Sequence, residues 1–275
     1  LANFNIDFLF MYKTYLQQCL KREKLIRWPK SAFPLKFYLA PCRWYQSSSQ
    51  GIDYIGLVKE ALQVWSQVSN GVVSFEQVSS LMQSQVNLDW QRVDRKALGY
   101  CTYNYDKLGR LYSAEVQIGL SDGILHKEYM AKEEVFHTIL HEIGHALGLG
   151  HSIYKEDIMY TPHQYGVINV SKNDVATLNW MYKIPNALTI EEACQSYNIN
   201  ASTFDELVLK IDKNSRLTDE DRQKIKKQKE KQNIEGTKQL IEEHQRIGEL
   251  KKYVMGLQNI QVSSNVSDYI RKNIR

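Results

Sequence analysis

The chain has 275 residues, of which 43% are hydrophobic and 24% charged, and its formal net charge is +4. This composition is typical of a globular protein that can bury a real core, and the interleaved charges argue against a nucleic-acid-binding surface. No apolar run approaches the roughly 20 residues that a membrane-spanning helix needs. The four cysteines form no C-x-x-C pair, so a cysteine metal site is unsupported and their disulfide state stays open.

Residues 1–29 are expected to form a helical, amphipathic lead-in. Prolines after Trp28 and Phe33 end this helix, because the residue before a proline disfavours helical geometry. The basic cluster KREK (21–24) is interpreted as the solvated surface of the same helix.

A strand, a helix and several further strands follow. The segment 34–41 alternates apolar and polar residues like a half-buried strand, and 53–69 carries apolar residues at helical spacing. A long helix is expected to begin near Lys132. This order predicts an α+β fold, in which long helices cover one mixed, mostly parallel sheet. Its remaining strands are expected within 71–78, 86–93, 98–105 and 110–120.

After Pro185 the strand patterns stop and helix signals dominate, so residues 186–275 are expected to form a helical C-terminal region. Five of its apolar residues recur at spacings of seven, three, four and three, which is a short heptad stripe. The stripe indicates a helical hairpin, a coil that binds a partner or a second copy, or a helix packed back on its own domain. These residues are Leu240, Ile247, Leu250, Val254 and Leu257.

The most informative stretch is HEIGHALGLGHS, residues 141–152. On the helix expected here, His141 and His145 are four residues apart, so both imidazoles project from one face. This spacing lets two ring nitrogens reach one ion at the short distances that zinc requires. Glu142 lies between them, with its carboxylate near the same ion and free to act on its water.

Gly148 ends this helix and tolerates the left-handed turn that returns the chain toward the metal, and His151 then arrives as a third ligand. Three neutral nitrogens leave one zinc position open for water, which is the arrangement of a catalytic rather than a structural site. Unrelated core histidines are a poor alternative. By chance, H-E-x-x-H-x-x-G-x-x-H would arise in a chain of this length on the order of once in a hundred thousand sequences.

H-E-x-x-H-x-x-G-x-x-H is the motif of the metzincin metalloproteases. The fuller HEIGHALGLGHS resembles the matrixin branch, and bacterial and cyanobacterial relatives of the matrix metalloproteases in particular. DIMY (157–160) resembles the matrixin Met-turn, in which Met159 would underlie the three imidazoles, and residues 171–182 resemble the last helix of the catalytic domain. The resemblance covers roughly residues 30–185, which are expected to form a zinc metalloprotease catalytic domain.

The resemblance implies a zinc endopeptidase in which a metal-activated water attacks the peptide bond and Glu142 is the general base. Leu98 and Gly99 would begin the edge strand that pairs with an extended substrate. Tyr160 and Tyr165 would wall the pocket for the residue after the cleaved bond. The two strands before the helix carry no histidine and dense acidic loops are missing, so one catalytic zinc is expected, without a structural zinc or calcium.

The expected partner is a protein or peptide substrate, and family habit favours a secreted or cell-envelope location. Three alternatives stay open. One is a non-catalytic zinc-binding module that acts through its helical tail. The second is a latent protease whose cleft is covered by residues 1–28 or by the region after Pro185. The third is a different metal-assisted hydrolase, because a resemblance in fold does not fix the substrate. Cys19 is a poor match to the cysteine of the family's latency motif. The resemblance gives no role to His126, His137, His163 and His244.

Overall fold

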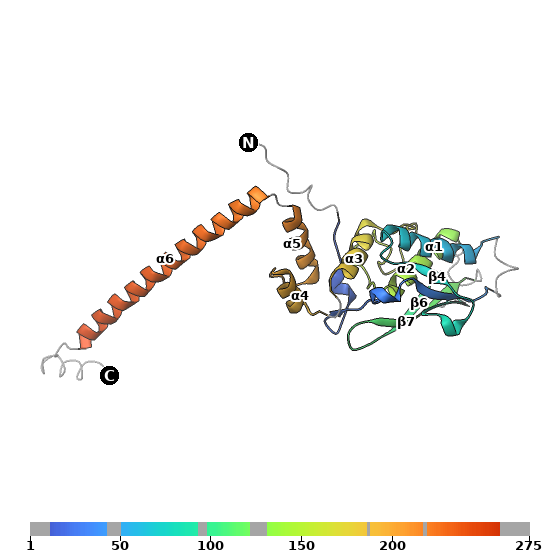
Figure 1. Ribbon diagram of the computed structural model, residues 1–275, viewed down its shortest axis with the longest axis horizontal. Helices are drawn as coiled ribbons and strands as arrows, with labels where there is room; N and C mark the ends of the chain where they lie inside the picture. Colours follow the sequence, from blue (N-terminus) through green and yellow to red (C-terminus); the bar gives the residue numbers. More distant parts are fainter. Residues whose placement is uncertain are drawn as a thin grey trace, which may run out of the picture. The chain divides into compact units, whose positions relative to one another are not determined.

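The computed structural model describes residues 12–42, 51–92, 98–121, 131–185, 188–216 and 219–258. The chain divides into two compact units after Lys213, and the elements of both are drawn in Figure 1. The first unit holds the sheet and most of the helices, and the second is dominated by one long helix, α6 (Asp219–Gln258). None of the helices in the described part of the chain has the length and apolar character needed to cross a bilayer.

A five-stranded sheet forms the centre of the first unit. It lies in the order β4-β3-β5-β7-β6, and every pairing is parallel except the antiparallel one between β7 and β6. The edge strand β6 is therefore hydrogen-bonded within this sheet on one side only. The mixed, mostly parallel sheet expected from the sequence is confirmed. Its strands are β3 (Leu35–Leu39), β4 (Phe75–Gln77), β5 (Val86–Arg92), β6 (Gly99–Tyr105) and β7 (Leu111–Leu120).

Two long helices, α1 (Tyr54–Val68) and α2 (Lys132–Ala146), pack against each other, and α2 also contacts β6 and β7. They lie side by side in Figure 1. Helix α1 begins after Asp53, whose side chain accepts a hydrogen bond from the Gly56 amide at 2.9 Å. The buried Trp65 indole donates to the Leu140 carbonyl at 3.1 Å, which fixes the two helices to each other. Helix α2 is thereby held against the end of the sheet where β6 begins.

The helix expected over the first 28 residues is wrong for residues 12–28, and residues 1–11 lie outside the described part. The segment forms a single 3-10 turn, η2 (Leu16–Cys19), and a hairpin of β1 (Leu20–Lys21) and β2 (Lys24–Leu25). Its apolar residues close the core instead of forming one helical face, because tertiary burial overrides a weak helical preference. The buried side chains are Tyr15, Leu16, Cys19, Leu25, Ile26 and Trp28.

Polar contacts fix this N-terminal segment to the rest of the first unit. The Trp28 indole donates to the Ala146 carbonyl at 2.8 Å, which satisfies an open acceptor at the end of α2. The buried Arg27 guanidinium donates to the carbonyls of Tyr182 and Ile184 at 3.1 and 2.8 Å. The segment is thus a structural layer beneath the end of α2.

Three helices follow the sheet, and the first unit ends within the last turn of the third. They are α3 (Lys172–Lys183), α4 (Ile190–Tyr197) and α5 (Phe204–Arg216). Phe204, Leu207 and Val208 of α5 are buried in the same core as the sheet. The Asp205 carboxylate accepts hydrogen bonds from the Thr14 hydroxyl at 2.6 Å and from the Leu16 amide at 2.7 Å. The compact unit therefore extends past Pro185 to Lys213, because α5 and the N-terminal segment pack on each other.

Helix α6 contains 40 residues without interruption, so the helical character expected of the C-terminal region is confirmed for its described part. Of the expected stripe, Ile247 and Leu250 have described side chains, and both are exposed. Those of Leu240, Val254 and Leu257 lie outside the described residues.

Candidate metal centre

Helix α2 carries two of the three expected zinc ligands. Val135, Ile139 and Ile143 are buried on its inner side, which fixes the rotation of the helix. His141 and His145 then emerge one turn apart on the side of a cavity, and their ring centroids lie 4.7 Å apart. The helical spacing in the sequence is sufficient to explain why these two rings meet.

Backbone carbonyls fix the orientation of both rings. Nδ1 of His141 lies 2.8 Å from the Ile158 carbonyl oxygen, and Nδ1 of His145 lies 2.8 Å from the Leu149 carbonyl oxygen. A carbonyl only accepts hydrogen bonds, so each Nδ1 carries the proton and each Nε2 keeps its lone pair for a ligand. Burial lowers the pKa of His145 to about 4 and that of His141 well below its usual range. Both rings are therefore neutral at pH 7, as metal ligation requires.

The loop after α2 returns the third histidine to the first two. Gly148 has a φ of +99°, and a Cβ there or at Gly150 would collide with the carbonyl oxygens of Ile26 and Gln18. Only glycine lets this loop lie so close to the N-terminal segment. Nε2 of His151 consequently lies 3.1 Å from Nε2 of His145.

The three residues fit a zinc ion. One ligand atom from each of His141, His145 and His151 lies within 4.8 Å of the others. Two nitrogens bound to a tetrahedral zinc at 2.0–2.1 Å are roughly 3.3 Å apart, which is close to the separation seen between His145 and His151. Among the described residues this is the one cluster of three or more side chains that satisfies such a ligand geometry.

Met159 packs against the part of α2 that lies between His141 and His145. Its side chain is fully buried and lies so close to Gly144 that a Cβ on this glycine would overlap with the sulfur. The Met159 carbonyl accepts a hydrogen bond from the Ser152 amide at 2.8 Å, next to the third histidine. Thus Gly144 makes room for a methionine under the helical part of the site.

A buried carboxylate holds Ile158, the residue whose carbonyl orients His141. The Asp174 carboxylate, at the start of α3, accepts from the Ile158 amide at 2.9 Å, the Ser171 amide at 2.9 Å and the Tyr15 hydroxyl at 2.6 Å. The carbonyl of the same Ile158 residue accepts from His141. A chain of contacts therefore connects the N-terminal segment to a metal ligand through Asp174.

Glu142 lies on α2 between the two helical histidines and faces the same cavity. Its side chain is largely buried, and burial raises the pKa of its carboxyl group to about 8. A Cβ on Gly99 would lie 2.6 Å from Cγ of Glu142 and 2.6 Å from the Thr138 methyl carbon. The absence of a side chain at Gly99 is what allows β6 to pass directly over this carboxylate.

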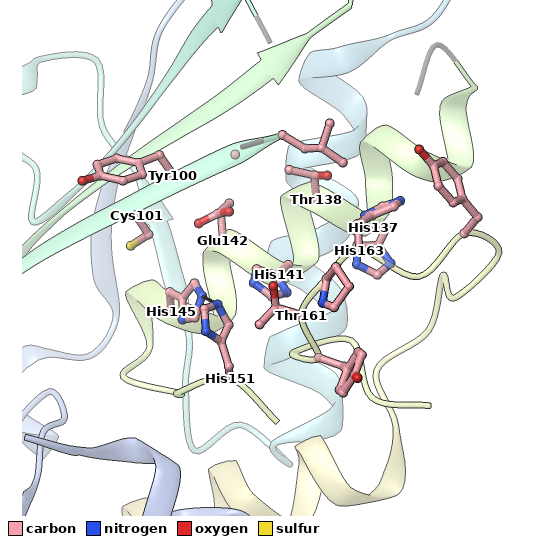
Figure 2. A pocket seen from close by; sticks show the side chains of 15 residues that line it. Tyr100, Cys101, His137, Thr138, His141, Glu142, His145, His151, Thr161 and His163 are labelled. Atoms are coloured by element: carbon pink, nitrogen blue, oxygen red, sulfur yellow. Dashed lines mark hydrogen bonds between the residues drawn. The ribbon is translucent and has the colours of Figure 1, made fainter. Parts of the chain in front are cut away.

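The three histidines and Glu142 line one cavity of about 580 Å³, and Figure 2 shows their side chains facing into it. Gly99 of β6 and Leu98 directly before it line one side of the cavity, and Tyr160 and Tyr165 line it from the loop after the Met-turn. All four residues proposed from the sequence to bind substrate therefore border one space with the metal ligands. Their contact with a substrate stays a prediction.

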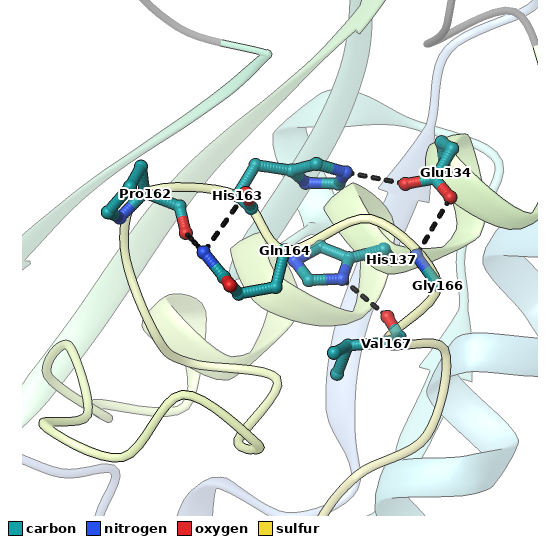
Figure 3. A network of polar contacts seen from close by, with 7 residues as sticks. All are labelled: Glu134, His137, Pro162, His163, Gln164, Gly166 and Val167. Carbon is teal, nitrogen blue, oxygen red and sulfur yellow. Dashed lines mark hydrogen bonds and ion pairs between the residues drawn. The ribbon is translucent and has the colours of Figure 1, made fainter.

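The wall of the cavity beside α2 is a polar network, drawn in Figure 3. The Glu134 carboxylate lies 2.6 Å from Nε2 of His163 and accepts from the Gly166 amide at 3.1 Å. Nδ1 of His137 lies 2.5 Å from the Val167 carbonyl oxygen. Three contacts thus fix the loop 163–167 to the first turns of α2.

Sequence reasoning left His137 and His163 without a role, although both line the cavity and their rings are 4.1 Å apart. The position of His137 one turn before His141 was the available signal, because the two residues share a face of the helix. Nothing in the sequence pairs His163 with Glu134, since the contact spans 29 residues.

A mixed sheet, a three-histidine centre and an adjacent carboxylate under an edge strand define a metallopeptidase-type domain. The chain matches the model of the matrixin family over residues 35–183, which is more than half of its length. It belongs to the matrixin family.

No curated protein matches the chain. One similar solved structure is described as the GM1 bound form of the ECX AB5 holotoxin. It is 16% identical with a TM-score of 0.42, and the alignment covers 68% of this chain and 98% of that one. This TM-score is too low to support a conclusion about fold or function.

Proposed function

We propose that the chain is a zinc endopeptidase in which Glu142 is the general base. The observation that carries this proposal is the position of Glu142: its buried carboxylate faces the cavity into which His141, His145 and His151 also point. Membership of the matrixin family supports metallopeptidase activity in general. The assignment of the base rests on the geometry.

His141, His145 and His151 would hold the zinc ion through their Nε2 atoms. When bound, zinc supplies a Lewis acid that acidifies a water molecule and polarises the peptide carbonyl. Glu142 accepts the proton of the attacking water at a carboxylate oxygen and then passes it to the nitrogen of the leaving amine. Burial raises the pKa of this carboxyl group, which makes its carboxylate a stronger base than one in water.

The edge strand β6 provides the means to hold a peptide. Among the described strands it pairs with β7 alone, and its residues alternate between half-buried and exposed. An extended peptide adds to such an edge by main-chain hydrogen bonds, whatever its side chains are. We propose that the substrate runs antiparallel to β6 over Gly99, and that the side chain after the cleaved bond enters the cavity walled by Tyr160 and Tyr165.

Mapping the cleavage sites in a mixed peptide library tests this proposal. The zinc-loaded chain is compared with Glu142→Gln, which keeps the size of the side chain but cannot accept a proton. Cuts made by the wild-type chain and absent from the variant support the proposal. A zinc-loaded wild-type chain that makes no cut, or a variant that makes the same cuts at the same rate, contradicts it.

Two further assignments are proposals of ours. A single zinc per chain, without structural zinc or calcium, follows from the ligand residues in the sequence, and a secreted or cell-envelope location follows from the family.

The alternative function is a zinc-binding module that acts through its helical tail. It is supported by helix α6, which exposes Ile234, Ile241, Ile247 and Leu250. A Glu142→Gln chain with unchanged biological effect would favour this alternative.

A further inference from the structure

The hairpin that carries the basic cluster lies between the third metal ligand and the end of the edge strand. On one side, the Cys19 sulfur accepts a hydrogen bond from the Gly150 amide at 3.2 Å, directly before His151. On the other side, the Arg27 amide donates to the Gly109 carbonyl at 3.1 Å, in the turn that follows β6. The segment between these two contacts, residues 20–25, is the β1–β2 hairpin.

Two features of the hairpin are expected to lower the stability of the fold. Arg22 and Glu23 form its two-residue turn with φ values of 50° and 65°, in the left-handed region that asparagine and glycine normally occupy in such turns. Lys21 and Lys24 are directly opposite each other across the strands, where like charges repel. Residues that destabilise the fold and lie together in one short segment are more typical of functional sites than of purely structural ones.

Basic side chains surround a groove of about 220 Å³ beside the hairpin. Lys21, Arg22, Lys24 and Lys107 line it, and Asp106 is its one acidic lining residue. The Asp106 carboxylate is already engaged by the Arg110 guanidinium at 2.6 Å. Among the described residues, none of these four basic side chains forms an ion pair, and the exposed Glu23 at the tip is not part of the lining. The groove is therefore strongly positive.

The hairpin lies next to the metal centre. The hydrogen bond from the Gly150 amide to the Cys19 sulfur joins the residue before His151 to the residue before β1. The groove also includes Tyr105, the last residue of β6. It thus begins near the third ligand and continues to the end of the edge strand that lies away from Gly99.

We propose that this basic groove binds acidic residues of the peptide substrate on the amino-terminal side of the cleaved bond. The inference rests on the proposed function, because a peptide antiparallel to β6 enters over Tyr105 and reaches Glu142 over Gly99. Six residue steps separate these two positions, and a strand rises about 3.4 Å per residue. The acidic residues are therefore expected about four to six positions before the cleaved bond.

Two peptides test the proposal. They share one cleaved sequence, and they carry glutamate or glutamine at the fourth to sixth positions before the bond. The ratio of their kcat/KM values is measured for the full-length wild-type chain, for Lys21→Gln/Lys24→Gln and for the control Lys59→Gln/Lys155→Gln. Lys59 and Lys155 are exposed and outside the groove, so the control changes net charge equally.

We expect the wild-type chain and the control to prefer the glutamate peptide by about three- to tenfold at low salt, as for two exposed ion pairs. In Lys21→Gln/Lys24→Gln the ratio should fall close to one. Equal rates for both peptides with the wild-type chain would overturn the proposal, and so would a ratio that falls equally in the control.

A binding measurement separates this inference from the proposed function. Fluorescence anisotropy of the two labelled peptides on zinc-loaded Glu142→Gln reports groove binding without turnover. Tighter binding of the glutamate peptide that depends on Lys21 and Lys24 supports the groove even if the wild-type chain cleaves neither peptide. Equal binding of both peptides refutes the groove even if both are cleaved.

Discussion

Replacing Asp174 with alanine should weaken both the fold and the metal centre. The carboxylate is fully buried and accepts three hydrogen bonds, from Tyr15, Ile158 and Ser171. Each donor left without a partner costs about 1–1.5 kcal/mol, so the free energy of unfolding should fall by about 3–4.5 kcal/mol. Urea denaturation of the metal-free chain measures this loss.

The same substitution releases the amide of Ile158, the residue whose carbonyl orients His141. Removing a partner behind a metal ligand typically weakens metal binding by about 10- to 100-fold, and we expect a loss in this range for Asp174→Ala. Competition with a zinc chelator measures it. The matched control is Thr177→Val, because Thr177 is buried on the same helix and its hydroxyl accepts from the Tyr15 amide at 3.1 Å and donates to the Asn173 carbonyl. This control should lose stability but keep its zinc affinity.

Asp174→Asn separates charge from hydrogen bonding. Burial is the main cause that raises the pKa of Asp174 above its ordinary value of 3.8. A carboxyl group with a raised folded-state pKa stabilises the fold fully below its unfolded pKa, and this contribution is lost as pH rises through the folded pKa. The asparagine side chain does not titrate, so the variant should gain stability relative to wild type as pH rises from about 3 to 7. A zinc affinity unchanged in Asp174→Ala, or a relative stability of Asp174→Asn that falls with pH, would refute the reasoning.

Three further substitutions test other parts of the site. Gly148 has a φ of +99°, and Gly148→Ala forces a methyl group against the Ile26 carbonyl oxygen. The substitution should lower the free energy of unfolding by more than about 2 kcal/mol and weaken zinc binding. An unchanged melting temperature would contradict this expectation. Gly99→Ala places a methyl group against Glu142, so kcat should fall at least about tenfold. The amount of bound zinc, measured by metal analysis, should stay constant. An unchanged kcat would count against the close approach of β6 to Glu142. Glu134→Gln weakens the contact with His163, so KM should rise a few-fold with kcat nearly constant, and a selective fall in kcat would show that the network acts on the chemistry instead.

Much of this architecture could be predicted from the sequence. Helix α2 and its two ligands follow from spacing alone, because residues four apart on a helix share a face. The strands β3, β5 and β7 follow from short apolar or alternating runs. The third ligand, His151, is predictable because Gly148 marks the turn that brings the chain back toward His141 and His145.

Other parts depend on contacts that no local pattern encodes. The N-terminal segment was expected to be helical, yet Tyr15 and Trp28 are buried against elements more than a hundred residues away. Such burial outweighs the helix propensity of a short segment. The contact between Glu134 and His163 joins a helix to a loop, and neither has a periodicity that predicts its partner. The groove at Lys21 and Lys24 likewise depends on a hairpin register that the cluster KREK does not reveal.

Zinc titration of the metal-free chain, with bound zinc and peptide turnover followed together, tests the function most directly. Turnover should rise in proportion to bound zinc and level off at one ion per chain. Glu142→Gln should bind the same single zinc with no turnover, because its three histidines are intact and its base is removed. Turnover by the metal-free chain, or full turnover by zinc-loaded Glu142→Gln, would contradict the proposed mechanism. That mechanism depends on the three histidines as zinc ligands and on Glu142 as the base.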